Sequence, residues 1–544
     1  MAGMEELLAV AVLALIGIAF ATLAGPRLGI AAPLLLVALG VGASLIPGVP
    51  ELTIEPEVIL AGILPPLLYA AAVSVPATDF RRELRSISGL SIVLVILSTV
   101  VLGFVFHALI PGLPLPWAFG LGAIVSPTDA VATGIIRRLG INPRVVTVLE
   151  GESLLNDAVS LVLLRASIAA AAVAVTVWGV TLAFVYALAM AIVIGYVVGK
   201  VNLWVRGLIS DPVVTTVISF TVPFAASIIA ELLNSSGLVA AVVAGLVTGH
   251  GAARKFAPQQ RMSDRTTWKA IELVLEGTVY LIMGLELVGV IEDVNKSHSG
   301  VARALWIAAI ALIVILAVRA AFVAPLIFGI RRRAMRAERI KPKVAEFRAH
   351  VESAPATSAI KLPRRKHKPM GPNASREQMR HRLTRFEADL SHAIDSPLGW
   401  REGTIIVWAG MRGVVTIAAV QTLPSDTPSR PLLVLIAFVV AIASLGIQGG
   451  TIGPVLRWVK PAKGLSPEER ELERAQLAEL LREATADLRA ELEASGADRV
   501  DAGLQLVKAS RDALLDIRDL GTFSGIVLED QLRRLDADQM RLEL

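Results

Sequence analysis

The sequence predicts an all-α membrane protein of about thirteen transmembrane helices with a helical cytoplasmic tail. Hydrophobic residues make up 54% of the 544-residue chain and charged residues only 18%, which is too apolar for an ordinary soluble protein of this length. Apolar runs long enough to cross a bilayer recur along the chain. Basic residues gather in every second loop between these runs, as the positive-inside rule requires.

The apolar runs give the order of the predicted helices. Glu5 and Glu6 precede the first run where a signal peptide would be basic, so we expect a retained helix there. The eighth and ninth runs are joined by a short turn at residues 234–237. The runs lie at about 7–24, 30–47, 58–76, 87–110, 116–137, 145–174, 176–200, 212–233, 235–251, 268–290, 301–330, 401–423 and 431–459.

Loop charge predicts the orientation in the membrane. One set of loops is basic, at Arg27 and residues 81–85, 137–144, 200–206, 254–265 and 331–333. The other set holds acids, prolines and turn residues. The alternation places the N-terminus outside and the C-terminus in the cytoplasm of a multi-pass protein of the cytoplasmic (inner) membrane.

Two soluble parts interrupt and follow the transmembrane residues, which are predicted at 1–330 and 401–460. Residues 331–400 form a basic cytoplasmic insert with the sequence PRRKHK at 363–368. We expect a solvated, partly disordered loop there, with contact to anionic lipids as the alternative. The tail, residues 464–544, is charged and predicted to be helical.

The tail carries two helix signals. Ser466 and Glu469 have the spacing of a capping box with a proline at the first helical position. An apolar stripe at helical spacing then follows at Leu477, Leu481, Ala484, Leu488 and Leu492. This stripe predicts a helix that packs within the tail, or a regulatory or dimer-contacting surface.

The fifth run contains Asp129 directly after Pro127 and Thr128. A carboxylate at mid-membrane depth costs about 2.5–3.5 kcal/mol, so such residues are usually functional. The proline should break the helix and free backbone carbonyls that can coordinate a cation. The alternative is a proline kink whose aspartate only caps a half-helix.

The sixth run carries a second carboxylate, Asp157, on one helix face with Ser153 and Asn156. Three oxygen-bearing side chains on one face suit a hard monovalent cation. Ser153 and Asn156 alone would be interpreted as helix–helix hydrogen bonds. With Asp157 beside them, they indicate a site for a small cation or a proton.

Further charges lie deep in the later runs. Arg319 is near the middle of the eleventh run, and Arg412 lies between glycines in the twelfth. Buried arginines need acidic partners, and Glu152 is the candidate; snorkelling to an interface suits Arg319 poorly. Glu276 in the tenth run is a candidate accessory carboxylate.

The motifs SPTDAVAT, LEGESLLNDA, GMRGVVT and LPPLLYAAA together resemble the cation–proton antiporter superfamily, specifically its sodium/proton exchanger branch. LEGESLLNDA is the most specific, and the resemblance extends from residue 1 to about 460. It implies a thirteen-helix fold with inverted-topology repeats, a homodimer, and two crossing broken helices, here spans five and twelve.

The resemblance also implies roles for individual residues. Asp157 would be the main ion and proton carboxylate, and Na+ would be held at Asp157, Asp129, Ser153 and Thr128. Asn156 implies electroneutral exchange, because an aspartate there marks electrogenic relatives. Glu152 and Arg319 would form a structural ion pair, and Arg412 would stabilise the crossing. Ala70 departs from the pattern, since many relatives have an acid at that position.

We therefore expect a secondary antiporter that exchanges Na+, or alternatively Li+ or K+, for H+ by alternating access among membrane lipids. It would not be an enzyme, and we expect no cofactor and no nucleic-acid partner. The sequence contains no phosphate-binding loop of the Gly-x-x-x-x-Gly-Lys type, which argues against ATP use. The rival hypotheses are a cation channel and a transport-inactive membrane sensor that signals through the insert and the tail.

Overall fold

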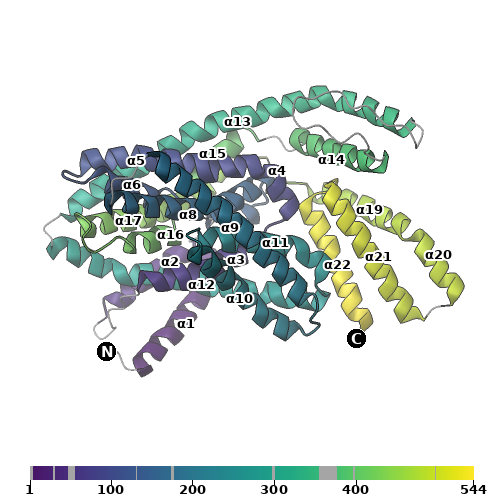
Figure 1. Ribbon diagram of the computed structural model, residues 1–544, viewed down its shortest axis with the longest axis horizontal. Coiled ribbons are helices and arrows are strands. Elements are labelled where there is room, and N and C mark those ends of the chain that lie inside the picture. Colours follow the sequence, from purple (N-terminus) through teal and green to yellow (C-terminus); the bar gives the residue numbers. More distant parts are fainter. Residues whose placement is uncertain are drawn as a thin grey trace. The chain divides into compact units, whose positions relative to one another are not determined.

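The computed structural model describes residues 4–28, 31–46, 55–129, 131–172, 177–296, 300–353, 376–395, 398–462, 464–496 and 498–543. The chain forms two compact units, whose helices are labelled in Figure 1. The first, here the transmembrane unit, comprises Met1–Val323 and Arg401–Ala462. The second, here the cytoplasmic unit after its predicted location, comprises Ala324–Trp400 and Lys463–Leu544.

Helices dominate the transmembrane unit, and three of them contain π-helical turns. In chain order they are α1 (Met4–Leu28), α2 (Ala32–Ser44), η1 (Val58–Ile63), α3 (Leu64–Ser74), α4 (Ala77–Ser88), η2 (Gly89–Leu94), α5 (Val95–Leu109), α6 (Leu115–Val125), α7 (Val131–Arg138), α8 (Pro143–Ala172), α9 (Val177–Arg206), α10 (Pro212–Leu232), α11 (Gly237–Lys255), α12 (Pro258–Lys296), α13 (Val301–Ser353, continuing past this unit), α15 (Trp400–Trp408), α16 (Val414–Gln421), α17 (Arg430–Ser444), η3 (Leu445–Gly449) and α18 (Gly450–Val459).

Each predicted apolar run coincides with one or more of these helices. Within the described residues, nine helices are long and apolar enough to cross a membrane. The remaining runs form shorter helices, such as Ala32–Ser44 and Leu115–Val125. In the fifth run the helix ends at Val125, just before Pro127. The fold is thus that of a multi-span helical membrane protein, while the count of thirteen spans stays a prediction.

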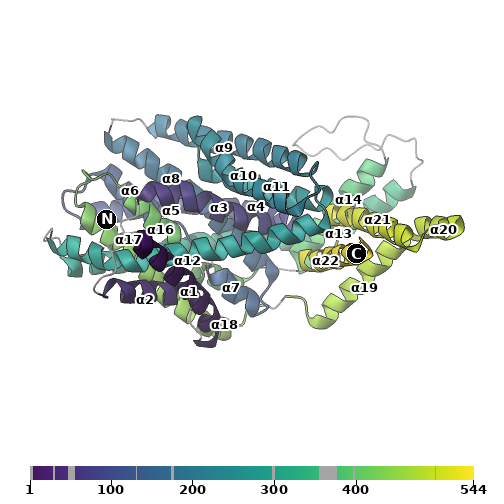
Figure 2. The same ribbon diagram turned by 90° about the horizontal axis from the view of Figure 1, so that it is seen from below.

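Small residues allow neighbouring helices to approach closely, as expected in a membrane. In the contact between α2 and α12, a Cβ atom on Gly40 would lie 2.3 Å from the Leu281 carbonyl oxygen, and one on Gly284 would lie 2.2 Å from that of Val37. The helices α9, α10 and α11 also pack side by side (Figure 2).

The cytoplasmic unit contains the rest of α13, α14 (Arg376–Asp395), α19 (Pro467–Ala484), α20 (Ala486–Ser495), α21 (Arg499–Leu520) and α22 (Gly525–Glu543). The expected loop is wrong for residues 331–353 and 376–395, which are helical. Alanine, arginine, lysine and glutamate fill much of 331–353, and these residues favour helices despite their charge. An ion pair between Arg348 and Glu387, at 2.7 Å, joins α13 and α14. The PRRKHK sequence lies outside the described residues.

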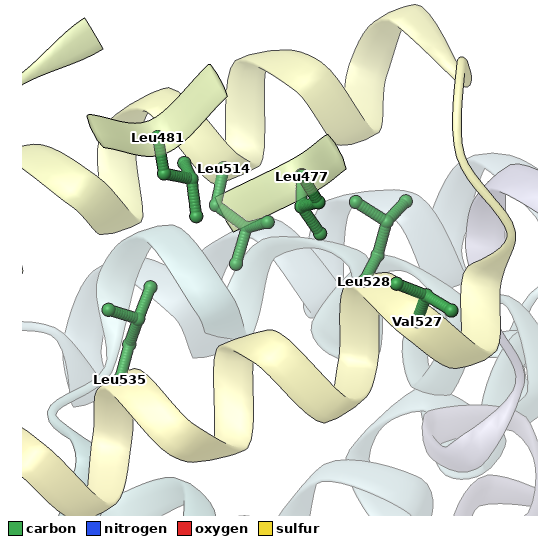
Figure 3. Packing of buried hydrophobic residues seen from close by; sticks show 6 residues of the cluster. All are labelled: Leu477, Leu481, Leu514, Val527, Leu528 and Leu535. Atoms are coloured by element: carbon green, nitrogen blue, oxygen red, sulfur yellow. The ribbon is translucent and has the colours of Figure 1, made fainter. Parts of the chain in front are cut away.

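The tail has the predicted capping box at the start of α19, where Ser466 and Glu469 bond each other's backbone amides. The predicted stripe continues only as far as Leu481, because the helix ends at Ala484 and the Thr485 hydroxyl donates to the Leu481 carbonyl at 2.8 Å. Ala484 is exposed, and the stripe's last two leucines are half-buried on α20. Figure 3 shows the core that forms instead, from Leu477, Leu481, Leu514, Val527, Leu528 and Leu535.

Candidate ion site

Two transmembrane helices are interrupted near their middle. The fifth run is split into α6, which ends at Val125, and α7, which begins at Val131, with Pro127 in the gap. The twelfth run is split into α15 and α16 by residues 409–413. Each gap leaves the carbonyls of one half-helix and the amides of the next without partners in their own helix. The two gaps therefore create polar backbone inside the membrane.

The two gaps lie against each other. The amide of Asp129 donates to the carbonyl of Met411 at 2.7 Å. At Gly413 the approach leaves no room for a side chain, because a Cβ atom there would lie 1.5 Å from Asp129 Oδ2. The structure thus brings together the two helices that the sequence predicted to be broken, at the points where they are broken.

An acid and an arginine compensate the ends of the half-helices. Asp129 Oδ1 accepts a hydrogen bond from the Val131 amide at 3.3 Å, at the N-terminus of α7. Arg412 Nε donates to the Val125 carbonyl at 3.2 Å, at the C-terminus of α6. The Arg412 guanidinium also donates to the Gly410 carbonyl, just after α15. Because helix N-termini are partly positive and C-termini partly negative, both charges are of the stabilising sign.

Glu152 and Arg319 form a bidentate ion pair beside this crossing. Arg319 donates to both carboxylate oxygens of Glu152, at 2.5 and 2.8 Å, and both side chains are buried. Arg319 Nε donates to the Ile406 carbonyl at 2.9 Å, and Thr128 Oγ1 donates to Glu152 Oε1 at 3.0 Å. The pair therefore connects α8 and α13 to both interrupted helices.

Asn156 extends this network toward the candidate site. Its Nδ2 atom donates to the carbonyl oxygen and the hydroxyl of Thr128, at 3.0 and 2.8 Å. Its Oδ1 atom is buried and accepts no hydrogen bond from any described residue. A buried amide oxygen without a donor is costly unless it meets water or a cation. Both oxygens of Thr128 accept from Asn156, and each has a second lone pair available for its predicted role as an ion ligand.

Asp157 lies one residue beyond Asn156 and is buried, with 7% of its surface exposed. In the described part of the chain no side chain or amide donates to its carboxylate, and Asp129 is close enough to repel it electrostatically. Ser153 shares its helix face and is half-buried. A buried carboxylate with a like charge nearby and no donor needs a proton or a cation to neutralise it.

Sequence reasoning missed one residue of the site, Tyr280 on α12. Its hydroxyl donates to Asp129 Oδ2 at 2.6 Å, and its side chain is buried. Glu276, the predicted accessory carboxylate, lies one helical turn earlier and is close enough to interact electrostatically with Asp129. A phenol one turn from an intramembrane acid was the available signal, because a buried tyrosine hydroxyl usually has a partner.

Ala70 is buried in α3. The preceding residue, Tyr69, packs against Trp268 of α12, with ring centroids 4.9 Å apart and the rings tilted by 56°. Because alanine has no carboxyl group, α3 contributes no acid at this position. The carboxylates at the two breaks come from α8 and from the loop between α6 and α7, with Glu276 of α12 nearby.

Comparison with known proteins agrees with this architecture. The sequence profile of the family described as "Sodium/hydrogen exchanger, transmembrane" matches residues 10–357 and 382–458. A protein of Escherichia coli K12, named as the uncharacterized Na(+)/H(+) exchanger YjcE, is 37% identical over 251 residues, which cover 44% of this chain and 45% of that protein. The chain thus matches less than half the length of this relative.

A longer match is found to a protein of Mycobacterium bovis, also named as an uncharacterized Na(+)/H(+) exchanger. It is 28% identical over 475 residues, which cover 84% of this chain and 76% of that protein. The solved structure of the sodium proton antiporter MjNhaP1 from Methanocaldococcus jannaschii superposes with a TM-score of 0.56 at 16% identity. That superposition covers 84% of this chain and 99% of the other, and it shows a shared fold.

Proposed function

Since the chain belongs to the sodium/hydrogen exchanger transmembrane family, we propose that it is a sodium–proton antiporter in which Asp157 carries the cation and the proton in turn. The proposal is supported by the interrupted helices, because unwound backbone inside the membrane is typical of ion sites in secondary transporters. It is also supported by the names of the relatives, which are sodium/proton exchangers. We place the protein in the cytoplasmic membrane with its N-terminus outside, as a homodimer among lipids.

The observation that carries the proposal is the different surroundings of the two carboxylates. Asp129 is held by a phenol hydroxyl and a backbone amide at a helix N-terminus, so its negative charge is stabilised. Asp157 has no such donor in the described residues and is buried. Its charge must therefore be neutralised by a bound ligand, and a proton and a cation compete for this one position.

Competition for one carboxylate is enough to couple the two fluxes. The protein would switch between its outward-open and inward-open states when a proton or a cation neutralises Asp157. It would not switch readily when Asp157 is charged, because an uncompensated charge inside the membrane is costly. The cation would be held between Asp157 and Asp129, with the Ser153 hydroxyl, Asn156 Oδ1 and an oxygen of Thr128 as further ligands. Hard oxygen ligands of this kind suit Na+ and also Li+, and in a wider site K+.

The test is a transport assay with purified protein in liposomes that contain a pH-sensitive dye. Addition of Na+ should cause proton movement in the wild-type protein, and Asp157→Asn should abolish it while the protein stays folded. Asp426→Asn, which changes an exposed carboxyl group in the loop before α17, is the matched control. Exchange near the normal rate in Asp157→Asn would refute the assignment of this carboxylate.

The same assay separates the proposal from its rivals. A channel would carry Na+ current without obligatory proton movement in the opposite direction. A transport-inactive sensor would move neither ion, although it would still bind cations. Running the assay with Li+, Na+ and K+ in turn identifies the transported ion.

A further inference from the structure

The Asp129 carboxylate is immobilised from several directions. Its Oδ1 atom accepts from the Val131 amide, and its backbone amide is bonded to the Met411 carbonyl. The absence of a side chain at Gly413 lets Oδ2 lie against the second broken helix. These contacts all come from the two interrupted helices themselves.

Tyr280 adds a contact of a different kind, because it comes from α12. Its hydroxyl donates to Asp129 Oδ2 at 2.6 Å, a short distance that is typical of a hydrogen bond to a charged acceptor. The ring is completely buried, so the hydroxyl has no competing solvent partner. Asp157 and Glu276 both repel Asp129. The Tyr280 hydrogen bond therefore fixes the Asp129 carboxylate, from a third helix, close to other acidic side chains.

We propose that Tyr280 is a positioning residue that fixes the Asp129 carboxylate and thereby determines which cation fits between Asp129 and Asp157. Tyr280 acts through Asp129, and its own oxygen is not a ligand in this proposal. Holding a ligand rigid narrows the range of ion sizes that a site accepts, since a mobile ligand can adapt to larger and smaller ions. This inference rests on the proposed cation site and adds the residue that sets its selectivity.

The transport test compares Tyr280→Phe with the wild-type protein for Li+, Na+ and K+. The substitution removes only the hydroxyl and retains the ring that fills the site. We expect KM for the preferred cation to rise roughly tenfold, because a hydrogen bond to a charged group is lost. Vmax should change much less, and the ratios of KM among the three ions should move toward one. Unchanged KM values and ion ratios would overturn the proposal.

The matched control is Tyr186→Phe. The Tyr186 hydroxyl also donates within the membrane helices, to the Leu233 carbonyl at 3.2 Å, but its side chain is exposed and lies at neither broken helix. This variant should transport like the wild-type protein for all three ions. A similar rise in KM in both variants would point to a general effect of removing a phenol hydroxyl and would contradict the proposal.

A second measurement keeps the test independent of transport. Thermal unfolding in detergent is compared for Tyr280→Phe, Asp129→Ala and the double variant. If Tyr280 acts through Asp129, the double variant loses less thermal stability than the sum of the two single variants. Strictly additive losses would overturn the positioning role. The two proposals can fail separately. If the cycle shows coupling but the wild-type protein transports no cation, the proposed function is refuted, while the contact between Tyr280 and Asp129 is supported.

Discussion

Arg319 on α13 holds both carboxylate oxygens of Glu152 on α8, at 2.5 and 2.8 Å, in a place where neither side chain reaches solvent. Removing one partner of a buried pair leaves an uncompensated charge and costs about 3–5 kcal/mol. Glu152→Ala and Arg319→Ala should each lower the thermal stability of the protein in detergent. The double variant should lose less than the sum, and additive losses would show that the two charges are not energetically coupled.

Two glycines of the twelfth span, Gly410 and Gly413, should tolerate no side chain. A Cβ atom at Gly413 would overlap the Asp129 carboxylate, and one at Gly410 would lie 2.5 Å from Arg319 Nε. We expect Gly413→Ala to abolish cation exchange and Gly410→Ala to reduce thermal stability, since backbone or buried charges must shift. Gly453→Ala, where a Cβ atom would meet nothing within 4 Å, is the control. It should raise helix stability slightly, by about 0.5–1 kcal/mol.

Exchange should be electroneutral. If Asp129 stays charged and Asp157 alone binds a cation or a proton, no net charge moves in one cycle. Turnover should then be insensitive to an imposed membrane potential, and solid-supported-membrane recordings should show no sustained transport current. A sustained Na+-induced current that is absent in Asp157→Asn would contradict this, and Glu276 would become the candidate for carrying a second proton.

The start of α19 should depend on pH through Glu469. A hydrogen bond from the Ser466 backbone amide, and a second one with the Ser466 side chain, lower the pKa of Glu469 below its ordinary value of 4.5. A carboxylate with a lowered pKa stabilises the folded state above its unfolded pKa, and this stabilisation is lost as the pH falls through the folded pKa. The protection factor of the Ser466 amide in hydrogen exchange should therefore fall at pH below 4.5.

Glu469→Gln provides the control for this prediction, because glutamine also completes a capping box but does not titrate. The variant should retain protection of the Ser466 amide at neutral pH and lose its dependence on acid. A pH dependence that is unchanged in Glu469→Gln would assign the effect to other groups.

Local signals in the sequence predicted the parts of the site that depend on one segment. Pro127 and the glycines around Arg412 predicted the two breaks because their effect on a helix is local. The need of a buried arginine for an acid made Glu152 a candidate partner of Arg319 or Arg412. The family resemblance implied Arg319, and the two residues meet across 167 positions of the sequence.

Tyr280 escaped prediction because a tyrosine in an apolar helix is compatible with ordinary core packing, and its partner lies 151 residues away. The helical course of residues 331–353 was missed for a different reason. A basic composition is typical of a solvated loop, but lysine and arginine are also good helix formers, and residues 331–353 are helical. Likewise, the tail stripe could not reveal the break at Thr485, where a hydroxyl bonds to the preceding turn.

The partners of Asp129 also constrain how the protein can be made. The fifth span leaves the ribosome before α12 and the twelfth span, yet Tyr280 and Met411 both belong to those later segments. During synthesis the Asp129 carboxylate is therefore without these partners until most of the chain has been made. Until then it must lie near water or within the insertion machinery, because burying an unpaired charge in lipid is costly. A chain that terminates before residue 411 would contain every carboxylate of the site, and Tyr280 as well, yet it would still lack the Met411 carbonyl that joins Asp129 to the second broken helix.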